Sequence, residues 1–160
     1  MDSNVILVFD REKKKVLMCC RRKPPYKGLL NLVGGKVEPG EEREHAAYRE
    51  LWEETAITRE DITLDNIVNF TYPHKFDGAQ EYILECYAGV LKRDVDIHGD
   101  ENDLLWISVD EDFTDASRFA GVGNIGRIEE IRKIYRNALQ KEARRPDCGV
   151  FFPAGSGGFK

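Results

Sequence analysis

The stretch that decides the fold runs from Gly35 to Ile57 and reads GKVEPGEEREHAAYRELWEETAI. Its part from Glu41 to Thr55 is rich in glutamate and alanine, which favour helix, and Pro39-Gly40 stands just before it. Glutamates gathered at the start of such a segment suit the positive end of a helix dipole. The sequence therefore predicts a helix over residues 41–55.

Three glutamates of this helix share one face. Glu50, Glu53 and Glu54 stand at i, i+3 and i+4, a spacing that brings Cβ atoms to within about 5–6 Å of one another. Each pair of charges repels by roughly 3 kcal/mol at an effective dielectric constant of 20. Such a face is either solvated or a site for a hard divalent cation, which prefers oxygen ligands. Because Arg43 and Arg49 are the only cations between residues 38 and 54, we favour the cation site.

Short apolar runs on both sides of this stretch predict strands, and the first two read as a β-hairpin. The predicted strands are 4–9, 16–20, 29–33, 62–72, 81–91 and 104–108, and isoleucines at helical spacing predict a second helix over 125–139. Strands, helix, strands and helix in this order predict a mixed α/β layer protein. Residues 1–143 are the expected domain, and residues 144–160 read as a Pro/Gly-rich tail.

Composition narrows the function classes. The 160 residues fit one domain, and 24 basic against 29 acidic residues give a net charge of −5. An acidic chain without a basic stripe is a poor DNA binder. No apolar run reaches membrane-span length, and the first residues resemble no secretory signal. Four cysteines without a Cys-x-x-Cys pair argue against disulfides and zinc, so we expect a cytoplasmic protein.

The charged and glycine positions of the stretch also form a known pattern. The pattern is Gly35, five residues, Glu41, seven residues, and then Arg49-Glu50-Leu51-x-Glu53-Glu54-x-Ala56-Ile57. It resembles the Nudix box of the Nudix hydrolases. The family has glycine where this chain has Ala56, so we expect a slightly different turn there. The resemblance implies the Nudix fold, an αβα sandwich around a mixed β-sheet, over about residues 4–143.

The resemblance also implies a chemistry: water attacks phosphorus and cleaves a pyrophosphate linkage, assisted by Mg²⁺ or Mn²⁺. It makes Glu53 and Glu54 the expected metal ligands, with Glu50 as a further ligand or as the group that activates water. The Gly35 carbonyl is another expected ligand. Arg49 matches the position that orients the carboxylates.

Further residues follow from the same resemblance. Glu41 matches an auxiliary position, and Lys36 either contacts a phosphate or is an exposed loop lysine. Many family members add an acidic residue from a later loop, and in 99–103 we choose Glu101, with Asp100 and Asp103 as rivals.

Substrate choice rests on residues outside the box. Residues 17–36 are similar to MutT-type nucleoside triphosphatases, where Arg21 matches a basic pocket residue and Asn31 a residue that reads the purine. Both have ordinary alternatives as loop residues. Asn124 either contacts the base or caps the following helix. Tyr72 and Pro73 both lie where other Nudix classes carry a marker, and they point to different classes.

We therefore expect hydrolysis of a nucleoside triphosphate, oxidised forms included, to monophosphate and pyrophosphate. The partner is a small nucleotide, and no membrane or DNA partner is expected. The alternatives are an ADP-ribose or dinucleoside polyphosphate hydrolase, an RNA 5′-end pyrophosphohydrolase, and a non-catalytic module that senses nucleotides. The oligomeric state is left open by the sequence.

Overall fold

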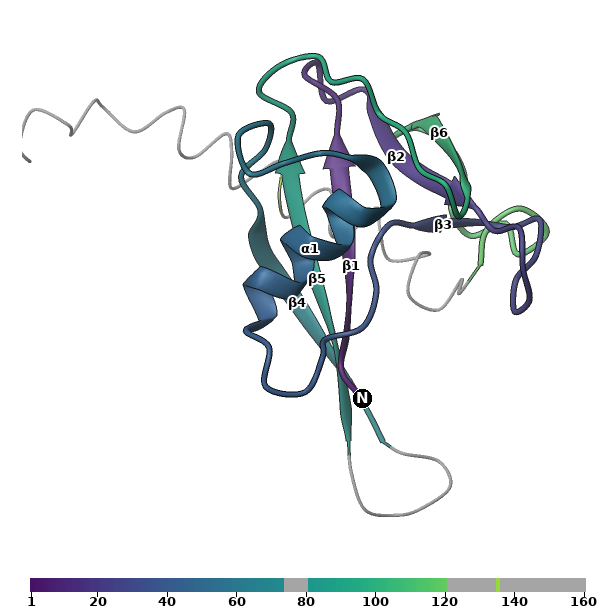
Figure 1. Cartoon of the computed structure of the whole chain (residues 1–160). Helices are drawn as coiled ribbons and strands as arrows, with labels where there is room; N and C mark the ends of the chain where they lie inside the picture. Colours follow the sequence, from purple (N-terminus) through teal and green to yellow (C-terminus); the bar gives the residue numbers. More distant parts are fainter. Residues whose placement is uncertain (74–80, 121–134, 136–160) are drawn as a thin grey trace, which may run out of the picture.

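The computed structural model describes residues 1–73, 81–120 and Tyr135. The elements in chain order are β1 (Ser3–Phe9), β2 (Lys15–Cys20), β3 (Leu30–Leu32), α1 (Arg43–Thr55), β4 (Asp65–Tyr72), β5 (Tyr82–Val90) and β6 (Asp103–Ser108). Six strands form one sheet, and α1 lies across it (Figure 1). In the part of the chain described, no helix is long and apolar enough to cross a membrane.

The sheet is mixed, as the sequence predicts. Its order is β3-β2-β1-β5-β4, and β6 pairs with β2. Strands β1 and β5 run parallel along their whole paired length, and the other neighbouring strands are antiparallel. A parallel pair at the centre requires a crossover, and the connection from β1 to β5 contains α1. The α/β class is confirmed.

The predicted hairpin of β1 and β2 is confirmed, but the two strands separate beyond the turn that joins them. The two strands pair at Phe9 and Val16, after which β2 turns to pair with β3 and β6. The space beside β1 is taken by residues 33–36: Ile6 N–H donates to the Val33 carbonyl at 2.8 Å. The glycine turn of the box is therefore held directly against the central strand.

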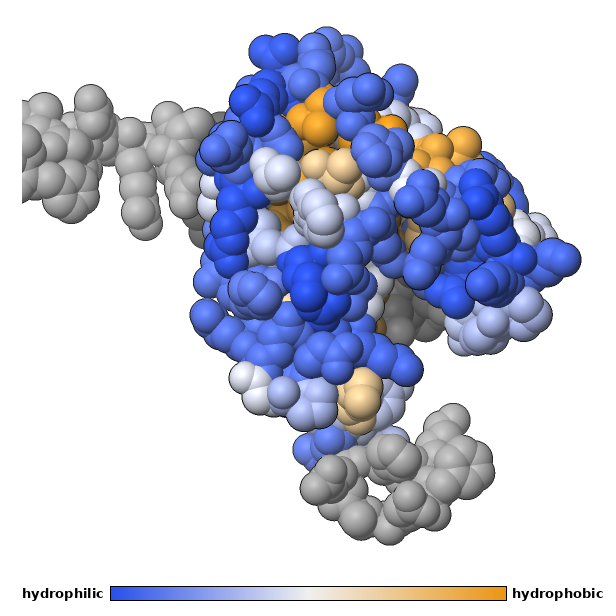
Figure 2. Space-filling model, in the orientation of Figure 1, coloured by the Kyte–Doolittle hydropathy of each residue, from blue (hydrophilic) through white to orange (hydrophobic). Residues whose placement is uncertain are grey.

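Alternate residues of each central strand face opposite sides of the sheet, and each side has its own apolar core. On the α1 side, Ile6 and Val8 pack with Leu51 of the helix. On the other side, Phe9 stacks on the helical Tyr135 with ring centroids 5.8 Å apart. Buried apolar contacts thus hold α1 on one face of the sheet. Hydrophilic residues predominate on the surface that Figure 2 shows.

Several predicted boundaries are wrong, most of them by a single residue. The helix begins at Arg43 and not at residue 41, because Glu42 is extended (φ −67°, ψ 136°) and acts as the N-cap residue. The strand expected over 62–72 begins at Asp65; Ile62 and Leu64 are buried in the connection before it. The strand expected over 29–33 is limited to Leu30–Leu32. The predicted helix 125–139, except for Tyr135, and the tail 144–160 lie outside the described residues.

The end of α1 corrects the expectation for Ala56. Its backbone is left-handed, with φ 65° and ψ 9°, and its N–H donates to the Trp52 carbonyl at 2.8 Å. Glycine is the usual residue in this conformation because it has no Cβ. The chain therefore makes the turn that glycine favours, and the alanine carries the steric cost.

Replacing Ala56 with glycine should stabilise the protein. The substitution removes the left-handed strain of an L-residue, so the free energy of unfolding should rise by about 1 kcal/mol in urea denaturation. Ala47→Gly is the matched control: Ala47 is buried inside the same helix, and glycine there should destabilise by roughly 0.5–1 kcal/mol. A loss of stability in Ala56→Gly would show that the turn does not strain the alanine.

Candidate metal and phosphate site

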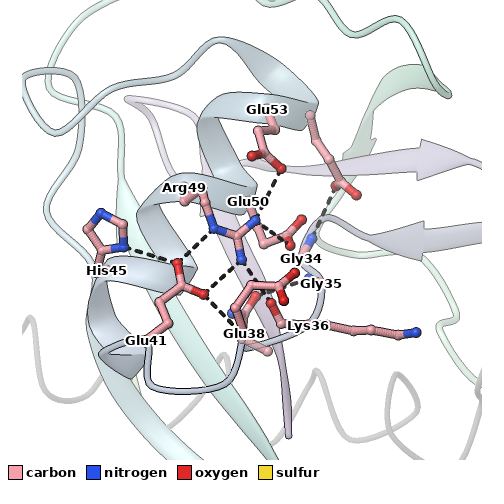
Figure 3. Close-up of polar contacts among 11 residues, drawn as sticks. Gly34, Gly35, Lys36, Glu38, Glu41, His45, Arg49, Glu50 and Glu53 are labelled. Atoms are coloured by element: carbon pink, nitrogen blue, oxygen red, sulfur yellow. Dashed lines mark hydrogen bonds and ion pairs between the residues drawn. The ribbon is translucent and has the colours of Figure 1, made fainter. Parts of the chain in front are cut away.

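Arg49 lies at the centre of the acidic face of α1 (Figure 3). Its guanidinium donates two hydrogen bonds to Glu41, at 2.7 and 3.0 Å, one to Glu50 at 2.9 Å and one to Glu53 at 3.2 Å. A further bond of 3.0 Å reaches the Lys36 carbonyl. One cation thus compensates three carboxylates and ties the helix to the turn that precedes it.

Glu41 anchors this arginine from the residues just before the helix. Its carboxylate accepts the paired bonds of Arg49, the Glu38 N–H at 2.9 Å and a contact from His45 Nδ1 at 3.0 Å. The Arg49 hydrogen bonds, with that from the Glu38 backbone, lower the pKa of Glu41 to about 2. Glu41 is therefore ionised and fully engaged, which fits an organising role beside the site.

Glu50 lies against the backbone of Gly35. A Cβ placed on Gly35 would lie 2.3 Å from the Glu50 carboxyl carbon, so only glycine leaves room for this side chain. Burial raises the pKa of Glu50, against the opposing effect of Arg49. The Glu50 carboxylate therefore lies beside the backbone of Gly35.

Glu54 is directed toward Gly34, which precedes Gly35 in the glycine turn. The Gly34 N–H donates to Glu54 Oε2 at 3.1 Å. Burial is the largest of several effects that raise the pKa of Glu54 to about 7. Gly34 has φ 146°, and a Cβ there would lie 2.3 Å from the Asn4 carbonyl oxygen. The turn therefore requires glycine at position 34, whereas glycine at position 35 leaves room for the Glu50 carboxylate.

Asn4 of β1 holds the Gly34–Gly35 turn in place through hydrogen bonds, a role that the sequence did not predict. Its N–H donates to the Gly35 carbonyl at 2.8 Å, and its Oδ1 accepts the Gly35 N–H at 3.1 Å. The side chain is 2% exposed, and its Nδ2 has no partner within the described residues. The available signal was a polar residue at the start of an otherwise apolar strand.

The loop expected to supply an additional carboxylate lies against the end of α1. His98 N–H donates to the Thr55 carbonyl at 3.2 Å, and a Cβ on Gly99 would lie 2.2 Å from the Glu54 carbonyl oxygen. Glu101 follows within two residues, and its charge is among the smaller effects raising the pKa of Glu54. Its rival Asp103 is paired with Arg22 at 2.5 Å.

Of the four residues predicted to bind substrate, the structure describes Arg21, Asn31 and Lys36. Arg21 donates from Nε to the Pro25 carbonyl at 2.9 Å, and its charge lowers the pKa of Glu54, so it lies on the side of the carboxylates. Asn31 is half-buried in β3, where its Oδ1 accepts the Leu32 N–H at 2.9 Å. The Lys36 side chain is exposed and extends away from Arg49 in Figure 3. Asn124 lies outside the described residues.

The donor chemistry fits a hard divalent cation. The carboxylates and the Gly35 carbonyl offer only oxygen, the ligand that Mg²⁺ prefers. Glu53 is the most open of the three helix carboxylates, at 48% side-chain exposure against 15% for Glu50. In residues 1–73 and 81–120, no three Asp, Glu, His or Cys side chains are already arranged so that together they could hold a metal ion. Arg49 and the Gly34 N–H hold the carboxylates, and a cation would compete for them.

Replacing Gly34 and replacing Gly35 with alanine should have different effects on stability and on the site. Gly34→Ala forces a methyl group against the Asn4 backbone, so urea denaturation should show a loss of about 1–3 kcal/mol or more. Gly35→Ala meets only the end of the flexible Glu50 side chain, so stability should change little while Mn²⁺ affinity falls roughly 10–100-fold. Equal losses of stability in both variants, with unchanged Mn²⁺ affinity in Gly35→Ala, would contradict this division.

Comparison with known proteins gives one family throughout. A family model described as the NUDIX domain matches residues 2–120. Nudix hydrolase 19 of Arabidopsis thaliana is 27% identical over 141 residues, covering 86% of this chain and 29% of the relative. An ADP-ribose pyrophosphatase of Bacillus subtilis is 38% identical over 58 residues, covering 36% of this chain and 31% of the relative.

Solved structures agree on the fold. A C. elegans Ap4A hydrolase in a binary complex matches with a TM-score of 0.62 at 19% identity, covering 88% of this chain and 98% of that chain. Identity at this level supports the fold alone. The chain spans about a third of the length of the curated relatives it matches.

Proposed function

Because the chain belongs to the NUDIX domain family, we propose that it hydrolyses the pyrophosphate linkage of a nucleotide with the help of Mg²⁺ or Mn²⁺. The observation that carries the proposal is the Arg49 guanidinium, which bonds to Glu50 and Glu53 beside the Gly34–Gly35 turn. A merely solvated acidic face needs no such cation at its centre and no glycine that leaves room for one of its carboxylates, as Gly35 does for Glu50.

Each residue then has a role. Glu53, Glu54 and the Gly35 carbonyl would hold the cation, with Glu101 as a further ligand. When bound, the cation neutralises phosphate charge and lowers the pKa of the attacking water. Glu50 would be either a further ligand or the group that accepts the proton of that water, and Oε2 is the oxygen for either role, since Oε1 is bonded to Arg49.

For the substrate we propose a nucleoside triphosphate, cleaved to monophosphate and pyrophosphate. Arg21 supports this choice because its positive charge lies close enough to Glu54 to lower the pKa of that carboxyl, where it can meet the phosphate chain. Asn31 is the middle residue of β3, opposite Cys19, and its amide can donate to a base edge. Asn124 remains a predicted base contact.

The second candidate substrate is ADP-ribose or a dinucleoside polyphosphate. The relatives support it, since one is named an ADP-ribose pyrophosphatase and another an Ap4A hydrolase. The tyrosine marker gives it no further weight: Tyr72 stacks on Tyr82 with ring centroids 5.0 Å apart. A non-catalytic module is disfavoured because all the carboxylates of the box are present.

A substrate panel tests the proposal and its site together. Canonical and oxidised nucleoside triphosphates, ADP-ribose, dinucleoside polyphosphates and triphosphorylated RNA are each incubated with Mg²⁺ or with EDTA, and phosphate products are measured. The enzyme is compared with Glu53→Gln and with the control Glu44→Gln, which makes the same change at an exposed position of the same helix.

We expect Mg²⁺-dependent release of pyrophosphate from a nucleoside triphosphate. Glu53→Gln should lower kcat roughly 100-fold or more, because it removes a cation ligand, and Glu44→Gln should leave it unchanged. Preferred turnover of ADP-ribose would replace the proposed substrate by the second candidate. Full activity in Glu53→Gln, or in EDTA, would refute the site assignment.

A further inference from the structure

One arginine outside the carboxylate helix makes three bonds to a single loop. Arg22 follows β2, and its backbone N–H donates to Asn102 Oδ1 at 3.1 Å. Its Nη1 donates to the Asp100 carbonyl at 3.0 Å, and its Nη2 to Asp103 Oδ1 at 2.5 Å. These three acceptors surround Glu101 in the chain, on both sides.

The opposite side of the same loop rests on the end of α1. The bond from His98 N–H to the Thr55 carbonyl and the close approach of Gly99 to the Glu54 carbonyl fix the loop just before Glu101. Residue 101 is thus held between two attachments, one to the helix that carries the metal carboxylates and one to Arg22.

The chemistry of arginine suits this attachment. Its planar fork can bind a carbonyl and a carboxylate at once, which a lysine ammonium cannot reproduce. An exposed ion pair such as that of Arg22 and Asp103 adds little to global stability. Three bonds to three neighbouring residues do, however, restrict a loop that would otherwise sample many conformations. The consequence of these bonds is therefore order in the loop.

We propose that Arg22 is a positioning residue that holds Glu101 in place as a ligand of the divalent cation. The inference rests on the proposed function for the identity of the bound group. It also means that the guanidinium of Arg22 is committed to the loop and is not part of a basic patch for phosphate, unlike its neighbour Arg21.

A double-mutant cycle with the metal alone tests this role. Mn²⁺ affinity is measured for the wild-type chain, Arg22→Met, Glu101→Gln and the double variant, and hydrogen exchange is followed in residues 98–103. Arg11→Met is the control, because Arg11 is also exposed but makes a single 3.5 Å contact, with Asp94. Arg22→Lys keeps the charge and loses the fork.

We expect Arg22→Met and Glu101→Gln each to weaken Mn²⁺ binding roughly 10-fold, and the double variant to be no weaker than Glu101→Gln alone. Exchange in the loop should rise in Arg22→Met, Arg22→Lys should fall between it and wild type, and Arg11→Met should match wild type. If Arg22→Met fails to fold, the same cycle with Arg22→Lys applies.

The role is overturned if Arg22→Met binds Mn²⁺ as wild type does, if Glu101→Gln has no effect, or if the two losses multiply. These outcomes are independent of turnover. A wild-type chain that hydrolyses a nucleotide but shows no coupling retains the proposed function and loses this role. A chain that hydrolyses nothing but shows the coupling retains the role and loses the proposed function.

Discussion

The site depends on one guanidinium placed among carboxylates that repel one another. Unpaired, the glutamates of α1 would disfavour the helix that carries them, by roughly 3 kcal/mol for each neighbouring pair. Arg49 bonds to Glu41, Glu50 and Glu53 and reaches the Lys36 carbonyl. It therefore fixes the helix face and the glycine turn relative to each other. Lysine, with one compact charge, could not make these directed bonds together.

Much of the fold could be predicted, because local patterns determine it. The periodicity of α1 and the short apolar runs of the strands follow from residues close in the chain, whereas the mixed sheet is expected from the resemblance to the Nudix family. Pairing between distant segments could not be derived in the same way. That β1 pairs with β5 along its length, and with β2 only at Phe9 and Val16, is decided by which strands and turns compete for its edges. The start of α1 at Arg43 depends on the extended backbone of Glu42.

The site divides along the same line. Spacing alone places Glu50, Glu53 and Glu54 on one helix face, but it says nothing of Asn4 or Arg22, which act through contacts 31 and 78 to 81 residues apart in sequence. The net negative charge of the chain is also concentrated in one segment. Residues 38–54 hold seven glutamates and two arginines, which equals the whole formal charge of −5. A loaded divalent cation would turn that acidity from a barrier to phosphate into a means of binding it.

Binding of a divalent cation to this acidic face in the native state is tested most directly by thermal unfolding in EDTA and in Mg²⁺. A ligand that binds only the native state raises Tm, so we predict a Mg²⁺-dependent rise for the wild-type chain. Glu54→Gln should unfold at or above the wild-type Tm in EDTA, because one repelling charge is gone, and should lose most of the rise in Mg²⁺. An unchanged wild-type Tm in Mg²⁺ and Mn²⁺, or an equal rise in Glu54→Gln, would contradict cation binding at this face.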